Sequence, residues 1–195
     1  MTDSTRDFYN SNAHTYAASG TINPRLATFL NRCTPGGEIL ELGTGSGRDA
    51  RAMICAGFRV DATDGSSQLA AIAEHHIRQP VRVMQFQELA AKRAYDGIYA
   101  SASLLHVPRQ ELGGVITRVH TALRHNGVVW ASFKSGAAES LDALGRHYNY
   151  LSAPELSAVW HAGGDWSELS TESWQGSAFD KQPTEWVAVT AVRRE

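Results

Sequence analysis

Short apolar runs alternate with segments of helical spacing along most of the chain. Because these runs are too short for helices, they predict strands. The predicted strands are residues 38–42, 58–62, 81–84, 95–100, 128–133 and 185–192. Residues 128–133 are almost entirely apolar, which predicts a strand buried on both faces of its sheet.

Helical segments lie between these strands. One runs from a glycine cluster to Ala56, where Gly57 favours a left-handed cap. Ser66 is a typical N-cap residue for a second helix, and Pro108 is typical of the start of a third. The apolar residues at helical spacing are Leu69, Ile72, Ala73 and Ile77 in the second helix and Leu112, Val115, Ile116, Val119 and Leu123 in the third.

The pattern weakens after residue 134, where residues 154–162 predict a helix and residues 167–174 a strand. Strands that alternate with helices still predict an α/β fold with a mostly parallel sheet. Ligands of such sheets bind beyond the carboxyl ends of the strands, so a site is expected at the loops there. These loops are residues 43–47, 64–67, 85–88 and 101–107.

The composition narrows the function classes. With 195 residues, of which 43% are hydrophobic and 19% charged, the chain predicts one folded domain. The net charge of -2 and the lack of a basic run argue against a binder of duplex DNA. No apolar stretch reaches ~18 residues and the first seven residues are polar, which predicts neither a membrane span nor a signal peptide. Cys33 and Cys55 are expected to be reduced thiols of a cytoplasmic protein, and no metal site is predicted.

The strongest chemical signal is the glycine cluster at residues 43–47, which follows a strand and opens a helix. Glycines allow the backbone to turn sharply and to approach a ligand closely. The dinucleotide-binding pattern requires glycine where Arg48 stands, and Glu41 would repel a pyrophosphate. Asp64 ends the second strand, where a carboxylate can accept both hydroxyls of a ribose. Together these residues predict a nucleoside ligand whose other end is cationic.

With these segments the chain resembles the class I S-adenosylmethionine-dependent methyltransferases, near the small bacterial proteins of the tellurite-resistance group. The matching segments are residues 39–47, 61–64, 95–107 and 123–128. The resemblance implies S-adenosylmethionine as cofactor and a Rossmann-like, doubly wound sheet of seven strands with an antiparallel last strand. It also implies a single domain over residues 1–195, with a helical cap at 1–35, a cofactor-binding core at 36–134 and an acceptor side at 135–195.

The resemblance also implies roles for individual residues. Gly43 and Gly45 would hold the methionine moiety, Asp64 the ribose, and Gln85 would stand where many members have an aspartate facing adenine. Tyr9 and Tyr16 either shield the sulfonium or pack the cap onto the sheet. The implied cofactor-binding residues are Tyr9, Tyr16, Glu41, Gly43, Thr44, Gly45, Gly47, Asp64, Gly65, Ser66, Gln85, Phe86 and Ser101.

The acceptor side carries weaker signals. His106, Tyr148 and Tyr150 are candidates for contacting the acceptor, although His106 also suits a structural histidine at the sheet edge. Members that methylate nucleic acids often carry an Asn/Asp-Pro-Pro-aromatic stretch where residues 101–104 read Ser-Ala-Ser-Leu. We therefore expect a small-molecule acceptor, no nucleic acid, and a monomer or homodimer.

Two other interpretations share the fold. An NAD(P)-dependent oxidoreductase would use the same loop and ribose acid, but Arg48 and Glu41 argue against it. A non-catalytic protein that binds the cofactor and acts as a partner subunit is also compatible with this fold. The intact glycine loop and Asp64 favour an enzyme, because a protein without activity need not keep them.

Overall fold

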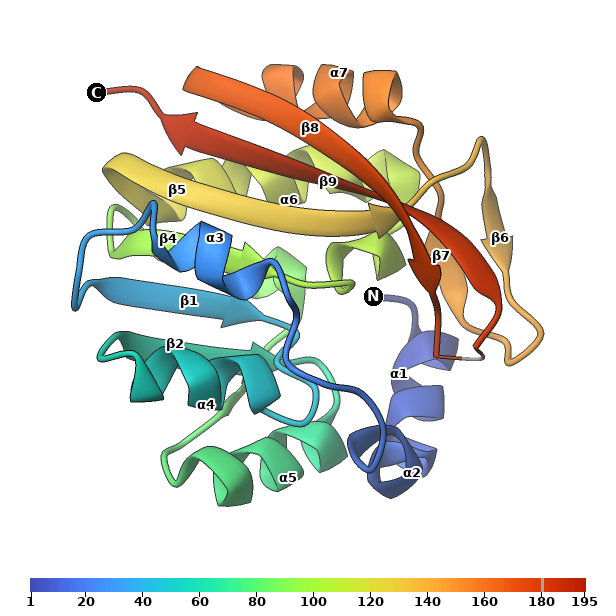
Figure 1. The fold of residues 1–195 in the computed structure, drawn as a ribbon. Helices are drawn as coiled ribbons and strands as arrows, with labels where there is room; N and C mark the ends of the chain where they lie inside the picture. The colour runs from blue at the N-terminus through green and yellow to red at the C-terminus, as the bar shows by residue number, and fades with distance from the viewer. Residues whose placement is uncertain (180) are drawn as a thin grey trace.

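A seven-stranded sheet forms the centre of the computed structural model, which describes residues 1–179 and 181–195 (Figure 1). Its strand order is β3-β2-β1-β4-β5-β9-β8. The strands are β1 Glu38–Leu42, β2 Arg59–Asp64, β3 Arg82–Val83, β4 Tyr95–Ala100, β5 Leu123–Lys134, β8 Trp166–Ser177 and β9 Pro183–Arg193. β1 to β5 pair in parallel, whereas β9 runs antiparallel to both β5 and β8. The predicted mostly parallel sheet with an antiparallel last strand is confirmed.

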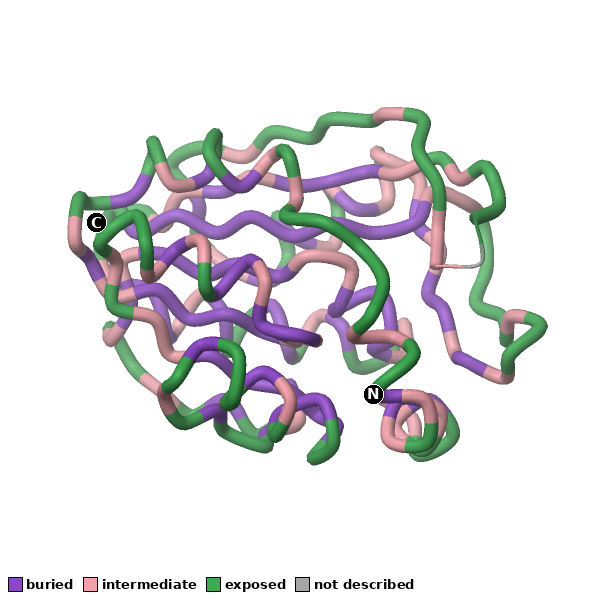
Figure 2. Tube along the Cα trace, turned by 60° about the horizontal axis from the view of Figure 1, so that its bottom comes forward, coloured by how far each residue is buried: buried purple, intermediate pink, exposed green. Residues whose placement is uncertain are grey.

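Helices cover both faces of this sheet. The helices are α1 Asp3–Ser11, α2 Ala13–Ala17, α3 Leu26–Leu30, α4 Arg48–Cys55, α5 Ser67–Ile77, α6 Arg109–Ala122 and α7 Ala153–Gly163, with 3₁₀ turns at Phe86–Glu88 and Leu104–His106. α3 and α4 pack on one face around Phe29, Met53 and Tyr99. α6 and α7 pack on the other face around Ile116 and Trp160. Figure 2 shows that the buried positions follow the strands between these layers.

The local signals in the sequence explain most element boundaries. The Ser66 hydroxyl accepts the Leu69 N–H at 3.2 Å, so Ser66 is the N-cap of α5 as predicted. Gly57 has φ +90°, which ends the turn after α4. Leu123 was expected on the third helix but begins β5, because the backbone at Leu123 is extended and ends α6. The strand predicted at 81–84 shortens to β3, an edge strand that pairs with β2.

Two hairpins lie after β5, where the sequence pattern was weak. β6 Glu139–Leu141 and β7 His147–Asn149 form a separate two-stranded sheet. β8 and β9 are paired up to Ser177↔Pro183, at the turn that joins them. The pairing of β9 with β5 ends earlier, at Trp186↔Lys134. The end of the β8–β9 hairpin therefore projects beyond the carboxyl end of β5, and Figure 1 shows it reaching toward α1 and α2.

The N-terminal helices α1 and α2 lie across the carboxyl ends of the parallel strands (Figure 1). α1 and α2 both contact α5, through a small cluster that includes Tyr9, Ala13 and Leu69. Among the described residues, no helix is long and apolar enough to cross a membrane.

Candidate functional site

The loop between β1 and α4 forms the floor of the site. Gly43, Gly45 and Gly47 have φ values of +79°, +58° and +78°, in the left-handed region that favours glycine. A Cβ atom on Gly43 would lie 2.5 Å from the Cβ of Ser103. The N–H groups of Gly43 and its neighbour both donate to the Thr63 carbonyl, at 2.9 and 2.8 Å. The three glycines therefore allow the turn that the sequence predicted.

Asp64, at the end of β2, joins this loop to the start of α5. Its carboxylate accepts the Gly45 N–H and the Ser66 N–H, each at 2.8 Å. Burial raises the pKa of Asp64 to about 6, and the two N–H donors oppose that rise. The carboxylate thus stands at the edge of the sheet where the ribose hydroxyls were expected.

A second buried acid, Glu41, lies at the end of β1. Its carboxylate accepts a hydrogen bond from the Thr44 hydroxyl. Burial raises the pKa of Glu41 to about 8, and the nearby carboxylates of Asp49 and Asp64 raise it further. Asp49 itself accepts the Asn23 N–H at 2.9 Å, and burial raises its pKa too. A bound cation would favour the ionised forms of these acids, so this floor suits a positively charged group.

The loops after β3 and β4 supply the next residues. Gln85 donates from its amide side chain to the Gly65 carbonyl at 3.3 Å, and Phe86 beside it is buried. Ser101 accepts a hydrogen bond from the side-chain amide of Asn23 at 2.9 Å. The loop that carries Asn23 is therefore tied to the carboxyl end of β4.

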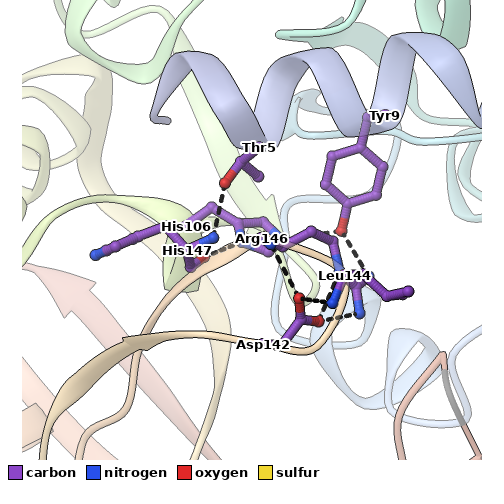
Figure 3. A network of polar contacts seen from close by, with 7 residues as sticks. All are labelled: Thr5, Tyr9, His106, Asp142, Leu144, Arg146 and His147. Carbon is purple, nitrogen blue, oxygen red and sulfur yellow. Dashed lines mark hydrogen bonds and ion pairs between the residues drawn. The ribbon is translucent and has the colours of Figure 1, made fainter.

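His106 forms part of a buried polar network beneath α1 (Figure 3). Its Nδ1 lies 2.6 Å from the His147 carbonyl, which can only accept, so Nδ1 carries the proton. The Tyr9 hydroxyl then donates to Nε2 at 2.9 Å. Burial lowers the pKa of His106 to about 3. His106 is therefore a neutral ring whose two nitrogens are both used by the protein.

Arg146 on the β6–β7 hairpin lies against the same tyrosine. Its Nη1 donates to the Tyr9 hydroxyl at 3.4 Å, and its guanidinium packs 5.0 Å from the centre of the Phe8 ring. The His147 N–H donates to the Thr5 hydroxyl at 2.8 Å, as Figure 3 shows. Both polar and aromatic contacts thus join the β6–β7 hairpin to α1.

Two adjoining cavities open at this edge of the sheet. The smaller, of about 40 Å³, is lined by Met1, Tyr9, Tyr16, Gly43, Gly45, Asp64, Gly65, Leu69, Phe86, Ser101, Ala102, Ser103 and His106. The larger, of about 530 Å³, lies between the glycine loop, residues 19–25 and the projecting β8–β9 hairpin. The smaller cavity has room for only a few water molecules, whereas the larger falls within the range of ligand pockets.

The structure brings most of the predicted residues to these cavities. Glu41, Gly43, Thr44, Gly45, Tyr16 and Ser101 line the larger one. Gly47 instead packs under α5, where an added Cβ would lie 3.0 Å from Ile77. Tyr148 and Tyr150 line neither cavity, and Tyr148 is buried under the side chain of Lys134.

Sequence reasoning missed part of the larger cavity. Asn23, Arg25, Trp174 and Trp186 line it, although no motif marked them. Contacts between residues so far apart along the chain leave no local signal.

The chemistry of the smaller cavity fits a nucleoside with a cationic tail. A buried carboxylate, a glycine turn and the buried ring of Phe86 surround it. The Met1 side chain also reaches into this space, because a Cβ on Gly65 would lie 2.6 Å from the Met1 Cε. The donor set fits S-adenosylmethionine, and the cap residues must move outward to admit it. No group of three metal-ligating side chains occurs among residues 1–179 and 181–195.

Comparisons with known proteins identify the family and the fold of this chain. A family profile described as a methyltransferase domain matches residues 13–164. The 1,6-didemethyltoxoflavin-N1-methyltransferase of Burkholderia thailandensis, solved with S-adenosylhomocysteine, has a TM-score of 0.76 at 22% identity, over 98% of this chain and 88% of that one. A search of curated proteins finds no match.

Other solved structures share the fold at lower identity. Phosphoethanolamine N-methyltransferase 2 of Haemonchus contortus, in complex with S-adenosylmethionine, has a TM-score of 0.77 at 14% identity, over 98% of this chain and 60% of that one. The [4+2]-cyclase SpnF has a TM-score of 0.70 at 16% identity, over 98% of this chain and 93% of that one. A cyclase among these structures shows that the fold by itself does not define the reaction.

Proposed function

The chain belongs to the methyltransferase domain family, and from that premise we propose that it transfers a methyl group from S-adenosylmethionine to a small-molecule acceptor. The observation that carries the proposal is the contact between Asp64 and the glycine loop, at 2.8 Å from the Gly45 nitrogen. In this proposal residues 36–134 hold the cofactor, residues 1–35 cover it and residues 135–195 supply the acceptor side.

Asp64 would accept the ribose hydroxyls, with Gly65 and Ser66 beside them. Glu41 would orient the glycine loop through Thr44, whose hydroxyl it already binds. Phe86 and Gln85 would border the adenine ring at the end of β3. Gly43 and Gly45 would let the backbone approach the methionine moiety. Each assignment rests on where the side chain lies at the carboxyl edge of the sheet.

The bound cofactor would supply a methyl group whose bond to sulfur breaks with the electron pair going to sulfur as the bond to the acceptor forms. The protein gains most from aligning the two reactants and excluding water, because charge becomes dispersed in this reaction. Tyr9 and Tyr16 would exclude water from above the glycine loop, since both line the smaller cavity. The edge-to-face contact between their rings, with centres 5.1 Å apart, holds them together.

His106 acts in this proposal as a positioning residue. Its neutral Nε2 already accepts from Tyr9, and burial lowers the pKa of His106 far below neutrality, so it is a poor proton acceptor. Its part is to fix the orientation of the Tyr9 phenol. Tyr148 supports the same cluster, with its ring centre 4.7 Å from that of His106 and 5.7 Å from that of Tyr150.

A small acceptor is supported by the negative net charge and by the structural neighbours, whose names refer to a toxoflavin precursor and to phosphoethanolamine. The two cysteines are free thiols, which supports a reducing compartment such as the cytoplasm. We propose that the protein acts there as a monomer or homodimer.

Thermal unfolding with S-adenosylhomocysteine, and in parallel with NADH, tests the cofactor. A ligand at a hundred times its Kd adds ~2.7 kcal/mol, which raises the Tm of a protein of this size by about 5–10 °C. We expect a rise with S-adenosylhomocysteine alone. A rise with NADH alone would favour the oxidoreductase. Transfer of a labelled methyl group to a panel of small acceptors then separates an enzyme from a protein that only binds the cofactor.

A further inference from the structure

The two cavities differ enough in size to decide where an acceptor can bind. His106 lines only the cavity of about 40 Å³, where the cofactor is expected, and Tyr148 lines neither cavity. The cavity of about 530 Å³ shares Gly43, Gly45 and Ser101 with the smaller one, so it adjoins the floor on which the methionine moiety is expected. The larger cavity is therefore the one with space for a second reactant.

The roof of this larger cavity is aromatic. Trp174 and Trp186 are direct cross-strand neighbours on the β8–β9 hairpin, and their rings are nearly parallel at 12°. Gly176, which also lines the cavity, would bring a Cβ within 3.1 Å of Trp186. The absence of a side chain there keeps the edges of both indoles open. Phe179 extends the aromatic wall and packs 5.2 Å from Tyr16. Flat rings of this kind favour stacking with another flat ring.

The walls of the same cavity are basic. Arg25 lies 3.6 Å over the Trp174 ring, and the backbone loop that carries it is tied down by Asn23. Its ion-pair partner Glu172 does not line the cavity. Lys181 contributes from the turn of the hairpin.

The remaining charged residues lie on the floor. Arg48 belongs there, because it donates to Ser46 at 2.7 Å and to the Ala17 carbonyl. Glu41 and Asp49 are the two acids of the lining, and both already accept hydrogen bonds from the protein. Arg25, Arg48 and Lys181 face these two acids, so the lining carries one formal positive charge in excess. The positive charge away from the floor belongs to Arg25 and Lys181.

We propose that the larger cavity binds a flat aromatic acceptor that carries an anionic group, with its ring against Trp186 and its charge directed toward Arg25 and Lys181. This inference rests on the proposed methyltransferase function and adds the class of acceptor to it. A cationic ring would meet the like charges of Arg25 and Lys181, and a non-aromatic anion would not stack on Trp186. The combination of both features defines the class.

Isothermal titration calorimetry with three probes of one shape tests the proposal. The probes are 2-naphthoate, 2-naphthamide and 2-naphthylmethylammonium, each titrated with and without saturating S-adenosylhomocysteine. We expect 2-naphthoate to bind at least tenfold more tightly than the ammonium probe, with the amide between them. In Arg25→Ala, the affinity for 2-naphthoate should fall at least fivefold while that for 2-naphthamide changes little. In Trp186→Ala, the affinity for all three probes should fall together.

Arg32→Ala is the matched control. Arg32 pairs with Glu168 on β8 as Arg25 pairs with Glu172, but it lies outside the cavity, so it should leave every affinity unchanged. Trp186→Phe replaces Trp186→Ala if the latter does not unfold cooperatively, and it should retain most of the binding.

The proposal is overturned if the ammonium probe binds as tightly as 2-naphthoate, if none of the probes binds, or if Arg25→Ala behaves as Arg32→Ala does. If the wild-type protein does not bind S-adenosylhomocysteine, the cofactor assignment is contradicted instead. The titrations without that ligand keep the two failures distinguishable.

Discussion

Asp142 and Arg146 form a buried ion pair across the turn between β6 and β7, with Oδ2 and Nη2 2.7 Å apart. The side chain of Arg146 is only 1% exposed, whereas that of Asp142 reaches solvent at 12%. The guanidinium also packs against the rings of Phe8 and Tyr148. One cation therefore holds together the hairpin and the helix that covers the site.

The two members of this pair should tolerate replacement unequally. Asp142→Ala leaves a buried guanidinium without its counter-charge, which costs about 3–5 kcal/mol. Arg146→Met fills the same space with an apolar chain and leaves an aspartate that water can reach, so about 1–2 kcal/mol is expected. Urea unfolding at neutral pH measures both losses. Equal losses would show that Asp142 does not compensate a buried charge.

Asp64→Ala should abolish the rise in Tm caused by S-adenosylhomocysteine, because the carboxylate would bind the ribose. It also leaves the Gly45 and Ser66 N–H groups without their acceptor, at a cost of about 1–3 kcal/mol in the absence of ligand. Asp61→Ala is the control on the same strand, where the carboxylate pairs with Arg82 and lines neither of the two cavities. A full ligand shift in Asp64→Ala would remove Asp64 from the site.

Gly45→Ala and Gly57→Ala separate backbone strain from ligand contact. Both residues have positive φ, so each substitution costs about 1–2 kcal/mol of stability. An added Cβ on Gly45 faces the cavity 3.4 Å from Tyr16, whereas one on Gly57 meets nothing within 4 Å. Only Gly45→Ala should lower the affinity for S-adenosylhomocysteine, by at least tenfold as measured by titration calorimetry. Similar affinities in the two variants would contradict the close approach of the cofactor to Gly45.

Stability should fall as the pH rises from 6.5 to 8. The raised pKa of Glu41, about 8, means that the folded protein holds a proton that the unfolded chain releases at lower pH. Folding is therefore favoured below this range and loses up to about 2 kcal/mol across it. Urea unfolding at a series of pH values measures the decline.

Glu41→Gln is the control for this decline, because the amide cannot ionise and should give a flatter profile above pH 6.5. His106 acts in the opposite direction at lower pH. Its pKa is lowered to about 3, so the unfolded chain binds the extra proton, and the contribution of His106 to stability rises between about pH 3 and pH 6.5, against those of Glu41 and Asp64. An unchanged slope in Glu41→Gln would show that another group releases the proton.

The parts of the site that could be predicted from the sequence are those that depend on residues close together along the chain. The glycine loop, the acid at the end of β2 and the Ser66 cap each depend on residues a few positions apart. Tyr9 and His106 are 97 positions apart, and their contact follows only from how α1 crosses the sheet. No regular spacing of residues along the sequence predicts such a contact.

Strands at residues 167–174 and 185–192 were predicted and correspond to β8 and β9, but their pairing into a projecting hairpin was not. β8 is an edge strand that is exposed along most of its length, so it lacks the alternation of apolar and polar residues that marks a half-buried strand. Its pairing is set by β9, which is buried against β5. The basic and aromatic walls of the larger cavity therefore became visible only once the strands were aligned.

The projecting end of β8 and β9 has a consequence for how this protein can diversify. On the turn side of Glu185, whose carbonyl still accepts the Ser135 N–H, the described residues of the two strands pair with each other. Removal or insertion of a matched pair of residues there would shorten or lengthen the roof and keep the alternation of faces. Such edits leave the parallel strands and their loops untouched. If the larger cavity binds the acceptor as proposed, changes in this hairpin would alter the range of acceptors while the residues expected to hold the cofactor stay the same.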